Sequence, residues 1–160
     1  MNEQSSNRNE FTEIKSQAEK FYKESKSVFC PALDVEVYFT SEGFNHLGYK
    51  EFGGERPKKI QMDKFKFVKD AIKIIKKTTT IQEYRRNLRR VGNKGRDGLY
   101  KTRIVEWFCF EAVISFKKRI RIRTIVRRVG DGNFHFWSVM PSWNLSGSLR
   151  SVGLVSVEDE

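Results

Sequence analysis

The chain has only two histidines, His46 and His135. An imidazole titrates near neutral pH, so each can take or give a proton as a general base or acid. Two such groups are sufficient to divide a pair of proton transfers. The alternative for His46 is a histidine that caps a helix. For His135 the alternative is a histidine packed in a strand between Phe134 and Phe136, or one whose ring stacks on a nucleobase.

Cations that could hold an anion follow His46 in the sequence and precede His135. Arginine is suited to a bidentate grip on phosphate and to stabilising charge that develops on it. Arg123 and Arg127 lie on one side of the alternating run RIRIRTIVRR and are the candidates for that role. The candidates for further phosphate contacts are Arg56, Lys58, Lys59 and Arg121.

Three further side chains complete the candidate site. Ser138 could hydrogen-bond a phosphate oxygen, or be only a small strand residue. Glu83 could be a general base, although it also completes a capping-box pattern at a helix start. Trp137 and Trp143 could stack on bases, a contact worth about 1–3 kcal/mol per base. Aromatic residues in strands are more often core, and we expect Phe136 to be core.

Composition limits the kind of protein. The chain has 160 residues and a formal net charge of +11, which predicts one folded domain that binds a polyanion, with nucleic acid the first choice. No apolar run approaches the roughly 20 residues of a membrane span. The polar start of the chain predicts no secretory signal, and Cys30 and Cys109 are expected as buried, reduced thiols. We therefore expect a cytoplasmic protein with no metal site and no cofactor.

The first two thirds of the chain favour helices. Apolar spacing predicts helices over residues 11–25 and 60–77, and the Thr80 to Glu83 pattern predicts a further helical piece over 78–90. A short strand is expected at 35–39. Ser41 is then expected to cap the short helix that carries His46. Residues 91–103, rich in glycine and charge, are expected to form an exposed loop.

The last third favours strands. Residues 106–115, 119–128 and 134–141 read as three strands of an antiparallel meander, so the predicted class is α+β, with N-terminal helices packed on a C-terminal antiparallel sheet. Strict alternation puts His135, Trp137 and Val139 on one face of the last strand and Ser138 on the other. The expected domain covers residues 11–145, between a disordered tail at 1–10 and a C-terminal tail at 146–160.

The segments VYFTSEGFNHL, ERPKK, KFKFVKDAIKIIKKTTTIQEY and RRVGDGNFHFWSVMP together resemble the phage-associated barnase-EndoU-colicin-RelE-like (BECR) nuclease domains, over residues 29–143. The resemblance implies a metal-independent endoribonuclease, acting as a toxin or phage-linked effector, with RNA as substrate and a cognate inhibitor or antitoxin as a further partner. It places a recurrent histidine at His46 and a recurrent hydroxyl at Ser138. His46 and His135 would then serve the 2′-hydroxyl and the 5′-oxygen leaving group.

Two other functions remain open from the sequence. A non-catalytic module that binds RNA or DNA would need the cations and aromatic residues but not His46. An interaction protein that inhibits or scaffolds a partner would need neither, and its partner binding would be insensitive to salt. Oligomeric state is open.

Overall fold

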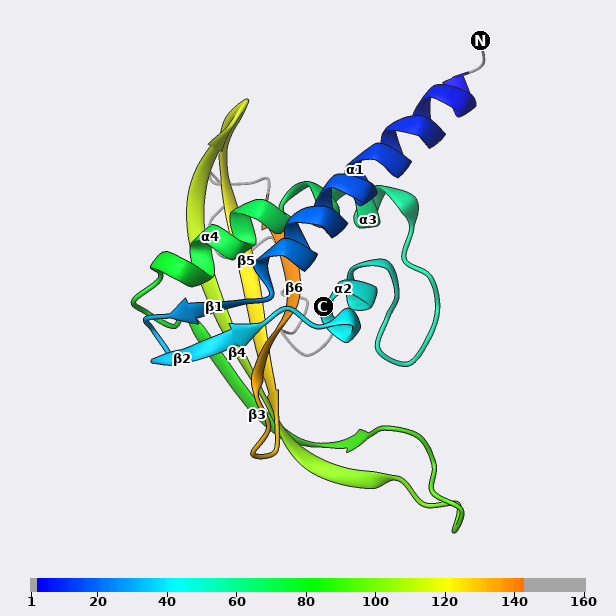
Figure 1. Cartoon of the computed structure of the whole chain (residues 1–160), viewed down its shortest axis with the longest axis vertical. Helices are drawn as coiled ribbons and strands as arrows, with labels where there is room; N and C mark the ends of the chain where they lie inside the picture. Colours follow the sequence, from blue (N-terminus) through cyan, green and yellow to red (C-terminus); the bar gives the residue numbers. More distant parts are fainter. Residues whose placement is uncertain (1–2, 143–160) are drawn as a thin grey trace.

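The structure is a computed structural model that describes residues 3–142, and it is α+β (Figure 1). Within these residues four helices accompany one six-stranded mixed sheet. The helices are α1 (Glu3–Ser25), α2 (Ser41–Gly48), α3 (Lys58–Lys66) and α4 (Val68–Lys77). The strands are β1 (Ser27–Cys30), β2 (Val35–Tyr38), β3 (Glu83–Val91), β4 (Lys101–Phe116), β5 (Lys118–Val129) and β6 (Phe134–Ser142).

The sheet order is β1-β2-β6-β5-β4-β3. Strands β3 to β6 form an antiparallel meander, and its last three strands were predicted. The prediction of an entirely antiparallel sheet is wrong, because β2 pairs parallel with β6 through Val37↔Phe134 and Tyr38↔His135. The hairpin β1–β2 thus joins the meander beside its last strand, and this puts the start of α2 next to His135.

The main core lies between the helices and one face of the sheet. Helix α4 buries Ala71, Ile74 and Ile75, as its apolar spacing predicts. Phe136 and Val139 contribute from β6. Each aliphatic or aromatic side chain buried in this way stabilises the fold by about 1.5–3 kcal/mol. The expectation that Phe136 is core is confirmed.

A β-bulge decides which side chains of β6 join the main core and which join a second buried cluster. Ile125 pairs with Ser138 and Val126 with Phe136, so Trp137 is an extra residue in the ladder. Trp137 packs with Ile125 in a second buried cluster that contains no helix residue, whereas Val139 lies in the helix-facing core. The strict alternation predicted for this strand is therefore wrong after Trp137, since the bulge shifts Ser138 and Val139 by one position.

The helix predicted over residues 78–90 is wrong, because β3 begins at Glu83. This strand pairs with β4 over nine consecutive residues, from Glu83↔Cys109 to Val91↔Lys101. The capping-box pattern is a local preference, and long-range strand pairing overrides it. The expected loop is shorter than predicted, because Lys101 already belongs to β4.

The other helices also differ in detail from the prediction. Helix α1 begins at Glu3, so residues 3–10 are helical instead of a disordered tail. The helix expected at 60–77 is interrupted at Phe67, which separates α3 from α4. Thr40, not Ser41, caps α2, and its hydroxyl accepts a hydrogen bond from the Gly43 amide. The predicted C-terminal tail and Trp143 lie outside the described residues.

Both thiols are buried and form no disulfide, as predicted. No helix within residues 3–142 is long and apolar enough to cross a membrane.

Candidate functional site

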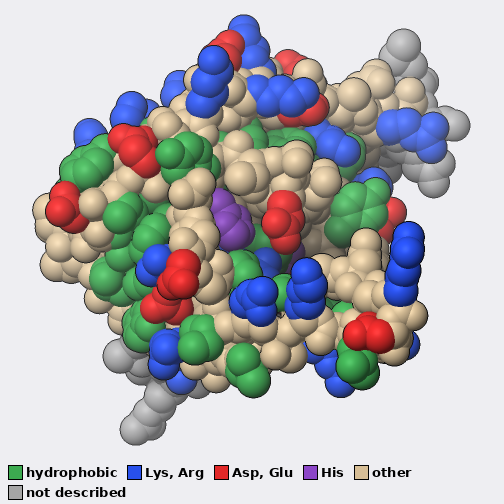
Figure 2. Space-filling view, turned by 60° about the horizontal axis from the view of Figure 1, so that its bottom comes forward, with side chains coloured by type: hydrophobic (Ala, Val, Ile, Leu, Met, Phe, Trp, Pro, Cys, Tyr) green, Lys and Arg blue, Asp and Glu red, His purple; other side chains and the backbone are tan. Residues whose placement is uncertain are grey.

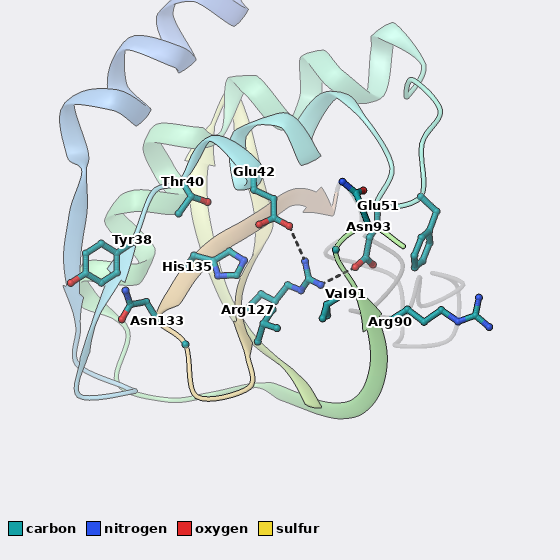
Figure 3. A pocket seen from close by; sticks show the side chains of 14 residues that line it. Tyr38, Thr40, Glu42, Glu51, Arg90, Val91, Asn93, Arg127, Asn133 and His135 are labelled. Atoms are coloured by element: carbon teal, nitrogen blue, oxygen red, sulfur yellow. Dashed lines mark hydrogen bonds and ion pairs between the residues drawn. The ribbon is translucent and has the colours of Figure 1, made fainter. Parts of the chain in front are cut away.

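A pocket of about 720 Å³ opens where β2, α2, the end of β3 and the β5–β6 hairpin meet. Figure 2 looks onto this hollowed face, where a histidine side chain lies between acidic and basic groups. His135 and Arg127 line the pocket together with Glu42, Glu51 and Arg90. Figure 3 shows the imidazole, the Arg127 guanidinium and the two carboxylates directed toward one another.

Sheet pairing positions His135. It lies opposite Arg127 on β5 and beside Tyr38 on β2, one residue after β6 begins. The turn that returns the chain from β5 to β6 contains Gly130, whose φ of 53° is a left-handed conformation that glycine adopts without steric cost. His135 is therefore held by strands on both sides.

The surroundings of His135 favour its neutral form. Burial is the main cause that lowers its pKa, and the positive charge of Arg127 lowers it further. A hydrogen bond to the backbone of Asn133 and the charge of Glu42 act in the opposite direction. Nε2 has no hydrogen-bond partner among the described residues, so the bond to Asn133 uses Nδ1. A neutral ring that donates from Nδ1 leaves an unprotonated Nε2, and this nitrogen is itself buried, so a neighbouring group must move before a ligand can reach it.

Arg127 is buried and compensated. Its Nη2 donates to Glu51 Oε1 at 2.8 Å, and its Nη1 lies 3.6 Å from Glu42 Oε1. Burial lowers the pKa of the guanidinium, and the two carboxylates counteract this. Glu51 is largely buried, whereas the Glu42 side chain is 68% exposed. An incoming anion could replace Glu42 far more easily than Glu51.

Gly43 permits α2 to bring Glu42 to this place. A Cβ at Gly43 would overlap the carbonyl oxygen of Phe136 and lie 2.6 Å from Tyr22 Oη. The Tyr22 hydroxyl donates to the carbonyl of Thr40 at 2.7 Å, and burial raises the pKa of this phenol. Only glycine allows the first turn of α2 to pack so closely against β6.

His46 is not on the pocket wall. Its ring stacks on Trp137 with centroids 3.9 Å apart, while the Arg127 guanidinium carbon lies 4.0 Å from the same centroid. Two groups at this distance cannot share one face of the indole, so Trp137 lies between His46 and Arg127. His135 meets the same ring edge-on at 5.9 Å. Both histidines thus contact Trp137, but only His135 lines the pocket.

Trp137 itself is 2% exposed, so its ring faces pack against protein and are not open to a nucleic-acid base. The interpretation of Trp137 as a stacking platform is wrong for this reason. The ring instead holds Arg127 in place through a cation–π contact.

Arg56 is buried beside His46 and is not a surface cation. Its Nε donates to the His46 carbonyl at 3.0 Å, and its Nη2 lies 3.2 Å from His46 Nε2. Arg56 is a predicted phosphate contact, but its guanidinium is buried against His46 and fixes the loop after α2. Lys58 is exposed and pairs with Glu55 at 2.7 Å, and Lys59 is exposed.

Ser138 is fully buried and lies away from the pocket. Its hydroxyl accepts a hydrogen bond of 2.8 Å from Lys64, whose ammonium is also fully buried and contacts the Val139 carbonyl at 3.3 Å. This contact joins α3 to the edge of β6. A phosphate could not reach the Ser138 hydroxyl without opening that edge.

Arg123 and Glu83 belong to a separate cluster. Arg123 Nη2 donates to Glu83 Oε2 at 3.0 Å, and its Nε lies 3.5 Å from Glu111 Oε1. Arg121 approaches Glu111 at 3.9 Å. None of these four side chains lines the His135 pocket. Of the predicted catalytic residues, the structure brings only His135 and Arg127 together there.

The sequence reasoning missed Glu42, Glu51 and the Asn133 carbonyl. Glu42 lies in the first turn of a short helix, where acidic residues are common for reasons unrelated to function. Glu51 lies in a loop, and no pattern pointed to it. Their nearness to Arg127 depends on the parallel pairing of β2 with β6.

Comparison with known proteins gave no family model, curated protein or solved structure that matches this chain. Within the described residues, no group of three or more His, Cys, Asp or Glu side chains is arranged to hold a metal ion.

Proposed function

We propose that this protein is an endoribonuclease that cleaves RNA without a metal ion, and that His135 is its general base. The observation that carries the proposal is a buried, neutral imidazole with an unpartnered Nε2, beside an arginine, in a pocket on a strongly basic protein. The resemblance of four segments to the phage-associated BECR domains is the reason to choose RNA among polyanions. Helices that precede a four-stranded meander support a BECR-like fold.

The proposed reaction is a transesterification. His135 Nε2 is buried in the free protein and would have to open to the pocket when RNA binds. It then takes the proton of a ribose 2′-hydroxyl as that oxygen forms a bond to the adjacent phosphorus. The bond from phosphorus to the 5′-oxygen breaks, and that oxygen takes a proton from water. The products are a 2′,3′-cyclic phosphate and a 5′-hydroxyl end. The base, once protonated, returns its proton to solvent.

Arg127 is the group that would stabilise charge on the phosphate. Its contacts with Glu42 and Glu51 make this cluster net negative in the absence of substrate. A phosphate oxygen would therefore replace the exposed Glu42 carboxylate, while Glu51 continues to orient the guanidinium. Arg90, exposed at the rim, adds a second positive charge. The guanidinium is already oriented in the free protein, so little free energy is spent on reorganising it when charge develops on the phosphate.

The test is a cleavage assay on a defined single-stranded RNA in the presence of EDTA. We expect wild-type activity to rise with pH and to level off above the lowered pKa of His135, because only the neutral ring accepts a proton. His135→Gln should reduce cleavage by about 100-fold or more. Affinity for a 2′-O-methyl RNA of the same sequence, which lacks the nucleophile, should change little, and thermal unfolding should show that the variant is folded.

His46→Gln is the matched control. His46 contacts Trp137 and Arg56 but not the pocket, so we expect a smaller loss, about 10-fold, with an unchanged pH profile. An equal loss in both variants, together with a bell-shaped wild-type profile, would support a two-histidine mechanism and contradict His135 as the single proton-transfer residue. Cleavage abolished by EDTA would contradict metal independence.

The second candidate is a non-catalytic module that binds RNA. The exposed cations of β3 and the following loop favour this second function, because they can bind RNA without any catalytic group. Steeply salt-dependent RNA binding with no cleavage by the wild-type protein would support this second function over the first.

A further inference from the structure

The hairpin formed by the second half of β3, its loop and the start of β4 projects from the body of the molecule (Figure 1). We call residues 86–103 the arginine arm. Outside the ends of the two strands it consists of nine loop residues, 92–100. Every residue of the arm except Arg89 and Val91 is exposed.

The arm carries much of the charge of the protein. Its 18 residues contain seven cations and one acidic residue, Asp97, against a net charge of +11 for the chain. The cations are Arg86, Arg89, Arg90, Lys94, Arg96, Lys101 and Arg103. Because the arm is narrow and has two strands, these charges lie close together on a small surface, where their fields add.

Most of these cations are not neutralised. Among the described residues, no carboxylate forms an ion pair with Arg90, Lys94 or Lys101, and the same holds for Arg86 and Arg96. Asp97, the acidic residue of the arm, accepts a hydrogen bond from the Leu99 amide at 3.0 Å instead. Clustered and unpaired arginines and lysines are the feature that binds phosphates, with release of counterions.

Apolar groups lie between the cations. Leu88 and Leu99 are each 68% exposed, and Tyr100 is 41% exposed. The guanidinium of Arg90 and the ammonium of Lys94 lie 5.4 and 5.6 Å from the Tyr100 ring centroid. Both cations lie over the ring of this exposed tyrosine, so a base that replaces one of them can stack on Tyr100 while the displaced cation meets an adjoining phosphate.

The loop is held in shape and has its own hollow. The Gly95 amide donates to the Leu99 carbonyl at 2.8 Å, and the Gly98 amide donates to the Gly95 carbonyl at 3.0 Å. A hollow of about 530 Å³ is lined by Asn93, Arg96, Leu99, Tyr100 and Lys101, with Gly95 and Asp97. Asn93 also lines the His135 pocket, so the two hollows adjoin at this residue.

We propose that the arginine arm binds an unpaired stretch of RNA, with phosphates on its arginines and lysines and a base on Tyr100, and leads that strand past Asn93 into the His135 pocket. Unpaired RNA fits better than a duplex, because a duplex hides its bases and would press phosphates against Leu88 and Leu99. The inference rests on the proposed function for its choice of RNA, and it names single-stranded RNA as the substrate class.

The experiment measures fluorescence anisotropy of a labelled 2′-O-methyl RNA of about 12 nucleotides, a length typical of single-strand binding sites. This probe reports binding whether or not the protein cleaves RNA. A triple variant, Lys94→Gln, Arg96→Gln and Lys101→Gln, removes three charges from the arm. The matched control, Lys69→Gln, Lys73→Gln and Lys76→Gln, removes the same charge from α4.

We expect the arm variant to weaken binding about 10-fold or more near 100 mM salt, and to flatten the slope of log affinity against log salt by about 2. The α4 variant should lose far less. Tyr100→Ala should weaken binding about 10-fold, Tyr100→Phe should not, and Phe29→Ala, which removes an exposed aromatic ring from β1, should have no effect.

Equal losses in the arm and α4 variants would overturn the proposal, because binding would then follow net charge alone. Equal affinity for the same RNA folded as a hairpin duplex would overturn the choice of unpaired RNA. Suppose that the arm variant binds RNA poorly and that the wild-type protein does not cleave RNA. This result would support RNA binding by the arm and contradict the endoribonuclease, so the two proposals fail separately.

Discussion

Strand β5 and the arginine arm each contain five arginines, but most of those on β5 lie near carboxylates and most of those on the arm do not. Arg123 and Arg127 on β5 are buried against carboxylates, and Arg121 and Arg128 also approach them. The arginine arm has one acidic residue for seven cations and is almost entirely exposed. Arg123 and Arg127 are held by carboxylates within the sheet, whereas Arg90 and Arg96 of the arm are exposed and form no ion pair among the described residues.

This difference shows that a run of cations in a sequence does not by itself indicate whether the side chains are free to bind phosphate. The run RIRIR is the more conspicuous pattern and was the first candidate for phosphate binding. In a sheet, however, side chains from neighbouring strands lie directly opposite one another, and β4 places Glu111 opposite Arg123. The arm is a hairpin at the edge of the sheet, with no third strand to supply carboxylates.

The largest expected effect tests whether the ion pair of buried Arg127 with Glu51 stabilises the fold. Arg127→Ala leaves Glu51 without its cation, so we expect the free energy of unfolding to fall by about 3 kcal/mol or more. Arg90→Ala on the arm should change it by no more than about 0.5 kcal/mol. Urea denaturation of both variants measures the contrast. Similar losses would mean that the two regions do not differ in the way described.

A smaller effect is expected where α2 brings Glu42 to the compensated cluster. Gly43→Ala forces α2 away from the Phe136 carbonyl and the Tyr22 hydroxyl, so we expect a loss of about 1–3 kcal/mol in the free energy of unfolding. Gly53→Ala, in the loop before α3, controls for the loss of a glycine, although its φ of 93° adds backbone strain of its own. A Gly43→Ala variant as stable as wild type would contradict the close packing of α2 on β6.

The smallest effect sharpens the comparison through pH. Burial and Arg127 hold the pKa of His135 below its usual 6.5, so the unfolded chain binds more protons than the folded chain between the two values. The contribution of His135 is therefore constant above about pH 7.5, falls as the pH drops through 6.5, and levels off below the folded pKa. His135→Gln should lose less stability than wild type between about pH 8 and 5.5 in urea titrations. Parallel pH curves would show that burial and Arg127 together do not lower the pKa of this ring.

Sequence reasoning succeeded where period and composition decide the result. The apolar spacing of α4 predicted its buried face, and the alternation of Ile120 and Ile122 predicted strand β5. It failed at β3, where a capping pattern suggested a helix. Local preferences there are worth less than nine residues of strand pairing, and the partner strand lies too far along the chain for a local pattern to reveal it.

For the candidate site, the sequence by itself determined that two histidines and many arginines were present and that the last strand carried His135. Only the tertiary structure decided their use. The bulge at Trp137 set which side chains share a face, and the parallel pairing of β2 with β6 brought Glu42 and Glu51 to Arg127. Both features depend on contacts between residues far apart in the chain, where register and packing, not local preference, fix which charges meet.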